Sequence, residues 1–224
     1  MVDKKLVIAI DGPSGSGKSS VSQAVARHYK LEYLDTGAMY RALTWYVLEE
    51  GIDLSDRAAI AAAAQNFPLD QGTDPNHESI VVAGLDVSQQ IRSPRISESV
   101  SAVAAVPQVR HLLIELQRQL IAQAKKGIVA EGRDITTVVA PDASARILLT
   151  ASEEVRMARR GMQLGGSQSQ HQLKKQVADR DQKDSRVNNF SQAAEGVALV
   201  DSSELDFDQT VQAVITAVEE ELKR

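Results

Sequence analysis

The chain has 224 residues, a mass of 24.2 kDa and a formal charge of −5. Its length predicts one large domain or one domain with an insert, and its negative charge argues against a general nucleic-acid-binding protein. The sequence has no cysteine, which excludes disulfides and thiolate metal sites and suits a reducing, cytoplasmic compartment. The first predicted strand, Leu6–Ile10, is too short for a signal peptide or a membrane span.

A glycine-rich loop follows that strand and precedes a run of helix formers. It reads Gly12-Pro-Ser-Gly-Ser-Gly-Lys-Ser19 and matches the phosphate-binding pattern G-x-x-x-x-G-K-[ST]. A plain glycine-rich turn is the alternative, but every fixed position and the strand–loop–helix context agree with the motif. We therefore expect Lys18 to reach the β- and γ-phosphates of ATP and Ser19 to ligate Mg²⁺. The predicted ATP-binding residues are Gly12, Pro13, Ser14, Gly15, Ser16, Gly17, Lys18, Ser19 and Ser20.

The next segments alternate again between strand and helix. Leu31–Leu34 predicts a second strand, and Asp35 or Thr36 is expected to cap a helix that runs to about Glu50 and is stopped by Gly51. An alanine-rich helix is predicted from Ser55 to Gln65.

From Phe67 to about Ile91 the composition changes, and glycines, prolines and other turn residues become frequent. Turn residues separate short β-prone pieces, Ser79–Val82 and Leu85–Val87, with Ala83-Gly84 between them as in a hairpin. This indicates a small antiparallel sheet inserted into the chain. Two helices are then predicted, one opening at Ser93-Pro94 and a longer one at Pro107. The core stripe of the longer helix is expected to comprise Val109, Leu112, Leu113, Leu116 and Leu120.

The second half returns to short apolar strands, at Ile128–Ala130, Arg146–Leu149 and Val197–Val200, followed by a final helix, Phe207–Leu222. Together these patterns predict an α/β fold: a P-loop NTPase-type five-stranded parallel sheet flanked by helices, with the small antiparallel insert. The glycine loop falls at the carboxyl end of the first strand, where such sheets bind ligands.

Two short clusters of polar residues follow predicted strands. Asp35–Arg41 offers helix N-terminal amides, a hydroxyl and an arginine for a phosphate, although this cluster taken alone favours a capped helix with a surface arginine. Glu131-Gly132-Arg133-Asp134 follows the Ile128–Ala130 strand and is expected to face the same crevice as the glycine loop; its plainer reading is an Arg–Asp pair in a turn.

A third cluster is basic. Residues 153–190 contain eight Lys or Arg against five Asp or Glu, within a negative chain. Arg156, Arg159 and Arg160 share a helix face, and a glycine-serine break follows them. Surface ion pairing is the alternative, but beside two other phosphate-facing clusters we interpret residues 156–186 as a short helical lid that closes over phosphates.

The motifs also narrow the class of nucleotide-dependent protein. No guanine-reading Asn-Lys-x-Asp is present, and no apolar strand ends in the Asp-Glu pair of ATPases. A kinase for a small acceptor instead needs a second anion site and cations that cover the transferring phosphoryl group, and the three clusters supply candidates for both.

Over nearly its whole length, the chain resembles a known family, the bacterial cytidylate (CMP) kinases. The residues that carry the resemblance form several separate motifs. They are Ile10–Lys18, Leu34-Asp-Thr-Gly-Ala-Met-Tyr-Arg41, Ser101–Arg110, Gly132-Arg-Asp134, Thr137-Val-Val139, Pro141-Asp-Ala143, Arg180-Asp181 and Asp184-Ser185.

The resemblance implies a nucleoside monophosphate kinase that transfers phosphate from ATP to CMP or dCMP with Mg²⁺, acting as a monomer without nucleic-acid or membrane partners. It implies a kinase core over residues 1–66 and 105–224, with residues 67–104 as an inserted monophosphate-binding subdomain. Phosphoryl transfer is expected to depend on four cations: Lys18, Arg133, Arg156 and Arg159.

The same resemblance implies the acceptor-binding residues. Ser101, Arg110 and Asp134 resemble the cytosine-reading residues, and Arg180 and Asp184 the sugar contacts. Residues around the acceptor phosphate are Thr36, Tyr40, Arg41, Arg133 and Arg186. The chain departs from the family pattern after Asp184, because Arg186 comes one residue early and Pro-Leu is absent. Alternatives from other classes are another P-loop small-molecule kinase and a nucleotide-sensing protein without an acceptor.

Overall fold

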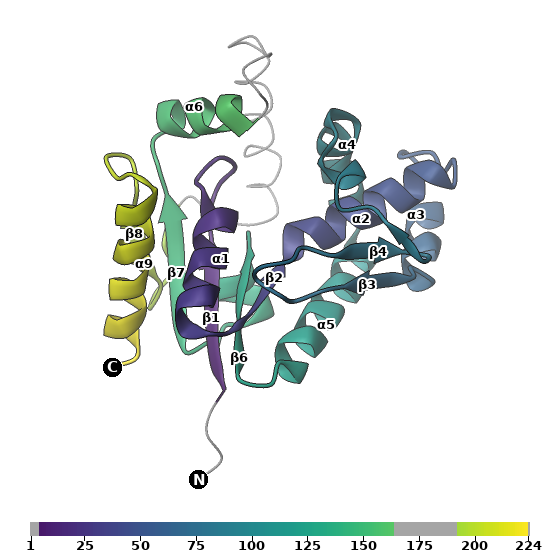
Figure 1. The fold of residues 1–224 in the computed structure, drawn as a ribbon. Helices are drawn as coiled ribbons and strands as arrows, with labels where there is room; N and C mark the ends of the chain where they lie inside the picture. Colours follow the sequence, from purple (N-terminus) through teal and green to yellow (C-terminus); the bar gives the residue numbers. More distant parts are fainter. Residues whose placement is uncertain (1–4, 164–191, 224) are drawn as a thin grey trace. The chain divides into compact units, whose positions relative to one another are not determined.

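A computed structural model describes residues 5–163 and 192–223. The chain forms two compact units, one comprising residues 1–33 and 124–224 and the other residues 34–123. We call them the first unit and the second unit and describe each by itself (Figure 1). The division of the chain into a core and an inserted 67–104 subdomain stays a prediction.

The main sheet has five strands in the order β2-β6-β1-β7-β8. Its strands are β1 (Leu6–Asp11), β2 (Glu32–Asp35), β6 (Gly127–Gly132), β7 (Ala145–Thr150) and β8 (Ala198–Asp201). The pairs of β1 with β6, β1 with β7 and β7 with β8 are all parallel. Each of the five strands expected from an apolar run is present, so the predicted P-loop type of α/β sheet is confirmed. The central strand is β1, and its register sets Asp11 opposite Gly132.

Two helices cover one face of this sheet, α1 (Lys18–Tyr29) and α9 (Phe207–Glu221), and they lie side by side (Figure 1). Their apolar residues, among them Val25 and Val214, join Ile8 and Ile147 of the strands in one buried cluster. A capping box starts α9: the Asp206 side chain accepts a hydrogen bond from the Gln209 backbone N–H, and the Asp206 backbone N–H donates one to Gln209 Oε1.

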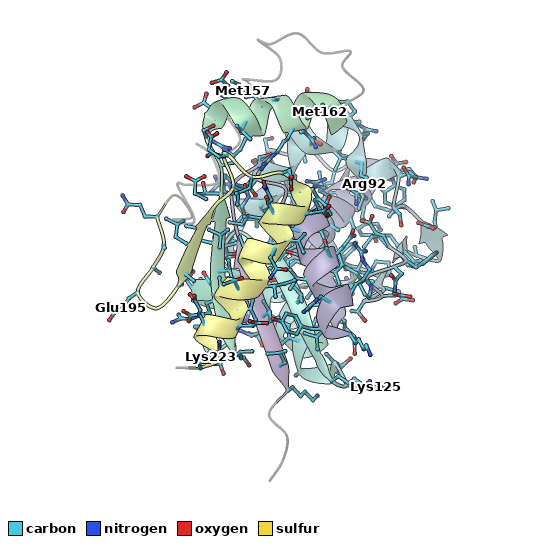
Figure 2. All side chains as sticks on the ribbon, turned by 60° about the vertical axis from the view of Figure 1, so that its left-hand side comes forward. Arg92, Lys125, Met157, Met162, Glu195 and Lys223 are labelled. Atoms are coloured by element: carbon cyan, nitrogen blue, oxygen red, sulfur yellow. The ribbon has the colours of Figure 1, made fainter. Side chains whose placement is uncertain are left out.

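Two further elements of the first unit follow the carboxyl ends of strands. A short π-helical turn, η2 (Ile135–Val139), comes directly after β6, and helix α6 (Glu153–Gln163) comes after β7. In Figure 2 the labels Met157 and Met162 mark α6. The P-loop lies at the same end of β1, so all three segments gather at the edge where parallel sheets bind ligands.

The second unit contains the predicted small sheet. Its strands are β3 (Leu69–Gln71), β4 (Ile80–Val82) and β5 (Leu85–Asp86), all antiparallel in that order. The hairpin turn between the last two falls at Ala83 and Gly84, which have φ angles of 51° and 80°. The predicted hairpin is therefore confirmed, with alanine in a left-handed position that usually favours glycine or asparagine.

Four α-helices and a 3₁₀ turn complete the second unit. They are α2 (Thr36–Glu49), α3 (Arg57–Gln65), η1 (Gln90–Arg92), α4 (Pro94–Ala104) and α5 (Pro107–Gln123). Asp35 caps α2, and Asp56 caps α3, which is why α3 begins after the predicted Ser55. On α5, Val109 and Leu113 are buried as expected. Leu116 and Leu120 of the expected core stripe are only half-buried, whereas Gln117 is buried.

The helices of the second unit pack through apolar side chains. Leu43 and Val47 of α2 contact Ile60 of α3 and Val103 of α4 in one buried cluster, and a second cluster joins α2 to β4. In the part of the chain that the structure describes, no helix has the length and apolar character needed to cross a bilayer.

Candidate active site

The glycine loop connects β1 to α1 as the motif predicts. A Cβ on Gly12 would lie 2.2 Å from the Leu149 carbonyl oxygen of β7, and a Cβ on Gly15 would lie 2.5 Å from the Arg156 carbonyl oxygen of α6. Only glycine permits these approaches, and Gly15 also has a left-handed φ of 78°. The loop therefore lies directly against β7 and α6, and its last glycine, Gly17, is the N-cap residue of α1.

The residues that end the motif face a buried carboxylate on the neighbouring strand. Ser19 Oγ donates a hydrogen bond of 2.6 Å to Glu131 Oε1, and Tyr33 Oη donates one of 3.2 Å to the same oxygen. Lys18 Nζ lies 3.9 Å from Glu131 Oε2 and 3.5 Å from the Pro13 carbonyl oxygen. Because Glu131 is only 1 % exposed, its charge acts on Lys18 and Ser19 with little screening by water.

Sequence reasoning missed the importance of this carboxylate. In the sequence, Glu131 is one of three charged residues directly after a predicted strand, and it does not belong to an Asp-Glu pair of the ATPase type. The structure extends β6 through Glu131 to Gly132, beside β1. An acidic residue at the end of the strand next to the P-loop strand was the available signal, but strand order cannot be read from a single sequence. Tyr33 gave no sequence signal at all.

Ser19 and Glu131 can also be tested for their fit to a metal ion. Within residues 5–163 and 192–223, no group of three or more His, Cys, Asp or Glu residues is suited to hold a metal. A hydroxyl and a carboxylate, Ser19 and Glu131, are hard oxygen donors of the kind Mg²⁺ takes when phosphate oxygens supply the other ligands. The residues present therefore fit a nucleotide-bound Mg²⁺ and do not fit a metal site made of protein alone.

Two of the predicted catalytic arginines contact the loop through its backbone. Arg156 Nη1 donates to the Ser14 carbonyl oxygen at 2.9 Å, and Arg159 Nη1 donates to the Ser16 carbonyl oxygen at 3.2 Å. Arg159 also binds both the side chain and the backbone of Ser202, and the Leu205 carbonyl. These arginines support the P-loop in this structure, and their action on a transferring phosphoryl group stays a prediction.

The turn after β6 contains the other predicted residues of the first unit. Arg133 is half-buried, Asp134 is buried, and Asp134 occupies the N-cap position of η2 without making a capping hydrogen bond. The cap comes instead from Asp11. Its Oδ1 accepts the Ile135 N–H at 2.9 Å, and its Oδ2 accepts the Thr136 N–H at 2.8 Å and the Thr136 hydroxyl at 2.6 Å.

Asp11 is unusual among the carboxylates of this chain. Burial raises its pKa, the hydrogen bonds from Thr136 and Ile135 oppose that rise, and the nearby charge of Asp134 adds to it. Sequence reasoning gave Asp11 no role, because nothing in the sequence shows that β1 ends beside the turn at residues 132–136.

The second unit brings together the remaining described candidates. Thr36, Tyr40 and Arg41 lie in the first turns of α2, whose N-terminus Asp35 caps. Ser101 lies near the end of α4 and Arg110 near the start of α5, and the three helices pack on one another. The buried Nε of Arg41 has no hydrogen-bond partner among the described residues. Three predicted acceptor contacts lie outside the described residues: Arg180, Asp184 and Arg186. The lid predicted for residues 156–186 is described only at its start, in α6.

The strand, loop and helix around Lys18, with a buried carboxylate on the adjacent strand, define a P-loop nucleotide-binding protein. A model of the cytidylate kinase family matches residues 8–220. The chain therefore belongs to the cytidylate kinase family, as its motifs predicted.

Similar proteins agree with this assignment. A cytidylate kinase of Streptomyces avermitilis is 48% identical over 219 residues, covering 96% of this chain and 93% of the relative. One from Nocardia farcinica is 48% identical over 225 residues, covering 98% of this chain and 96% of the relative. Among solved structures, an uncharacterized protein from Eubacterium ventriosum superposes with a TM-score of 0.52 at 13% identity, covering 96% of this chain and 99% of that one. This last likeness concerns the fold alone.

Proposed function

We propose that this protein is an ATP-dependent kinase for CMP and dCMP, with the reaction ATP + CMP → ADP + CDP. The observation that supports it most is the Lys18–Ser19–Glu131 arrangement beside the P-loop, in a chain of the cytidylate kinase family. The reaction needs no covalent intermediate, because an acceptor phosphate oxygen attacks the γ-phosphorus directly and ADP leaves in line.

The donor half of the site acts by position and charge. The loop amides between Gly12 and Gly17 and the N-terminus of α1 bind the β-phosphate, and Lys18 neutralises charge on the β- and γ-phosphates. Ser19 and Glu131 would hold Mg²⁺, which supplies further neutralisation of the phosphate oxygens when it is bound. Arg156 and Arg159 keep the loop in shape through the carbonyls of Ser14 and Ser16, and we assign both a contact with the phosphoryl group once the nucleotide is bound.

The acceptor half is assigned by chemistry. The amides that open α2, with Thr36, Tyr40 and Arg41, bind the acceptor phosphate, to which Arg133 and Arg186 add positive charge. The buried Nε of Arg41, which has no hydrogen-bond partner among the described residues, supports this assignment, because a phosphate oxygen satisfies a buried donor. The sugar is assigned to Arg180 and Asp184.

Base selection depends on hydrogen-bond polarity. Cytosine has an amino donor at N4 and acceptors at N3 and O2, so Asp134 pairs with the donor while Arg110 and Ser101 pair with the other edge. Uracil has an acceptor in place of the amino group and leaves the buried Asp134 carboxylate unmatched. Such a mismatch costs about 1–3 kcal/mol, so we expect CMP to be preferred over UMP by roughly tenfold or more.

An ADP-release assay with CMP, dCMP, UMP, AMP and no acceptor tests the proposal. We expect turnover with CMP and dCMP, much less with UMP, and almost none with AMP or without acceptor. Turnover of AMP equal to that of CMP, or none with CMP, would refute it. The first result would favour another P-loop small-molecule kinase. Thermal stabilisation by CMP without any turnover would favour a nucleotide sensor instead.

A further inference from the structure

The buried carboxylate of Asp11 has no place in the mechanism above, although it stands between the two substrate-binding segments of the first unit. It is the last residue of β1, immediately before the P-loop, and it is 3 % exposed. Within the described residues, every hydrogen bond it accepts comes from Ile135 and Thr136, and none comes from the loop it precedes. Its side chain is therefore directed at the turn after β6.

That turn has an unusual cap. An aspartate at an N-cap position ordinarily accepts a hydrogen bond from its own helix, as Asp35, Asp56 and Asp206 do here. Asp134 is at the N-cap of η2 and makes no such bond, while Asp11 accepts the first two N–H groups of η2 from the neighbouring strand. Capping by Asp11 therefore fixes the backbone of the turn to which Asp134 belongs.

Other contacts hold the same turn. The strand register places Asp11 opposite Gly132, so the residue before Arg133 is fixed to β1 by sheet pairing. The Thr136 carbonyl oxygen accepts a hydrogen bond of 3.4 Å from Arg146 Nη1 of β7. The other terminal nitrogen of Arg146 binds the carbonyl of Glu195, which is labelled in Figure 2. The turn is thus held by both of its neighbouring strands.

We propose that Asp11 is a specificity-positioning residue: by capping η2 from the P-loop strand, it holds the Asp134 carboxylate where that group reads the acceptor base. This inference rests on the proposed function. A carboxylate suits the task because its two oxygens together accept three hydrogen bonds. An asparagine side chain has only one acceptor oxygen, and its NH₂ group would face the N–H and O–H groups that now donate to Asp11. Asp11 touches no substrate and acts through Asp134.

The consequence is asymmetric between the two substrates. Loss of the cap disturbs Arg133 and Asp134 but breaks no contact made by the P-loop. Because a misplacement of about 1 Å can cost about 10²-fold, we expect Asp11→Asn to lower kcat/KM for CMP by 10- to 100-fold. The KM for ATP should change less than twofold, and the preference for CMP over UMP should fall about tenfold.

Two variants at Thr136 make the test independent of the fate of Asp11→Asn, should that variant fail to fold. Thr136→Val keeps the size of the side chain and removes one of the three donors, so kcat/KM for CMP should fall about threefold to tenfold. Thr136→Ser restores the hydroxyl and should recover most of the loss. Asp53→Asn is the matched control. Asp53 is an exposed aspartate whose side chain, like that of Asp11, accepts a hydrogen bond from a backbone N–H, in this case that of Ser55.

The experiment measures steady-state kinetics for both substrates, CMP affinity by calorimetry, and hydrogen exchange of the Ile135 and Thr136 amides. We expect faster exchange at these two amides, weaker CMP binding and reduced CMP preference in Asp11→Asn, and the same pattern in reduced form in Thr136→Val. Equal rises in KM for ATP and CMP, or a lower Tm with unchanged base preference, would overturn the inference. The exchange measurement needs no substrate, and a wild-type protein inactive on CMP would refute the proposed function separately.

Discussion

The two units hold their candidate functional residues by different means. In the first unit, polar side chains bind one another and the backbone of loops: Ser19 binds Glu131, Asp11 binds the turn after β6, and Arg156 and Arg159 bind P-loop carbonyls. In the second unit, the candidates lie on helices that are placed by apolar packing around Leu43. The first unit should therefore be sensitive to single polar atoms, and the second to lost volume.

The largest effect is expected at Lys18. Lys18→Met keeps the length of the side chain but removes the charge that faces the phosphates, so kcat should fall by about 10²- to 10³-fold. Steady-state ADP release measures it. Lys125→Met is the control, because Lys125 is an exposed lysine of the same unit, labelled in Figure 2. Loss of activity in both variants, or in neither, would contradict the role assigned to Lys18.

The next largest effect is expected at Glu131, the buried carboxylate that accepts a hydrogen bond from Ser19 of the P-loop motif. Glu131→Gln keeps an oxygen for Ser19 and Tyr33 to bind but removes the charge, so the free Mg²⁺ concentration for half-maximal activity should rise about 10- to 100-fold. Thermal stabilisation by ATP, measured with and without Mg²⁺, gives a readout independent of turnover. Glu220→Gln, an exposed site on α9, should behave like the wild type. An unchanged Mg²⁺ requirement in Glu131→Gln would remove this residue from the proposed metal site.

In the second unit, the sensitive feature is volume. Leu43→Ala creates a cavity in a fully buried site and should lower the free energy of unfolding by about 2–5 kcal/mol. Because α2 also contains Thr36 and Arg41, the KM for CMP should rise while the KM for ATP changes little. Leu85→Ala makes the same substitution at an exposed site and should cost less than about 0.5 kcal/mol. Urea denaturation and substrate kinetics test both variants, and equal costs at the two sites would break the comparison.

The smallest effect is expected at the hairpin of the second unit. Ala83 has a φ of 51°, and asparagine tolerates this conformation better than alanine does. Ala83→Asn should therefore raise the free energy of unfolding by roughly 0.5–1 kcal/mol, whereas the β-branched Ala83→Val should lower it. A Tm measured for each variant checks the sign, and a decrease for both would show that the turn conformation does not limit stability.

The sequence predicted the features that are set by a local pattern and missed those that depend on the order of the strands. Apolar runs such as Leu6–Ile10 and Ile128–Ala130 predicted every strand of the main sheet, because burial imposes a local pattern. The P-loop was equally plain, because its pattern of glycines, Lys18 and Ser19 lies within eight consecutive residues. What the sequence did not show was the order of strands. Asp11 contacts the turn after β6, and Ser19 contacts Glu131, because β6 lies beside β1, which joins residues more than a hundred positions apart. Tyr33 contacts Glu131 because β2 lies on the other side of β6.

One contact links the P-loop to the far end of the chain. Arg159 joins the Ser16 carbonyl to Ser202 and Leu205, in the segment between β8 and α9. Translation produces these partners almost two hundred residues after the loop itself, so a nascent chain has its glycine motif long before it has this support. The P-loop therefore obtains its full set of contacts only after the segment between β8 and α9 has been synthesised.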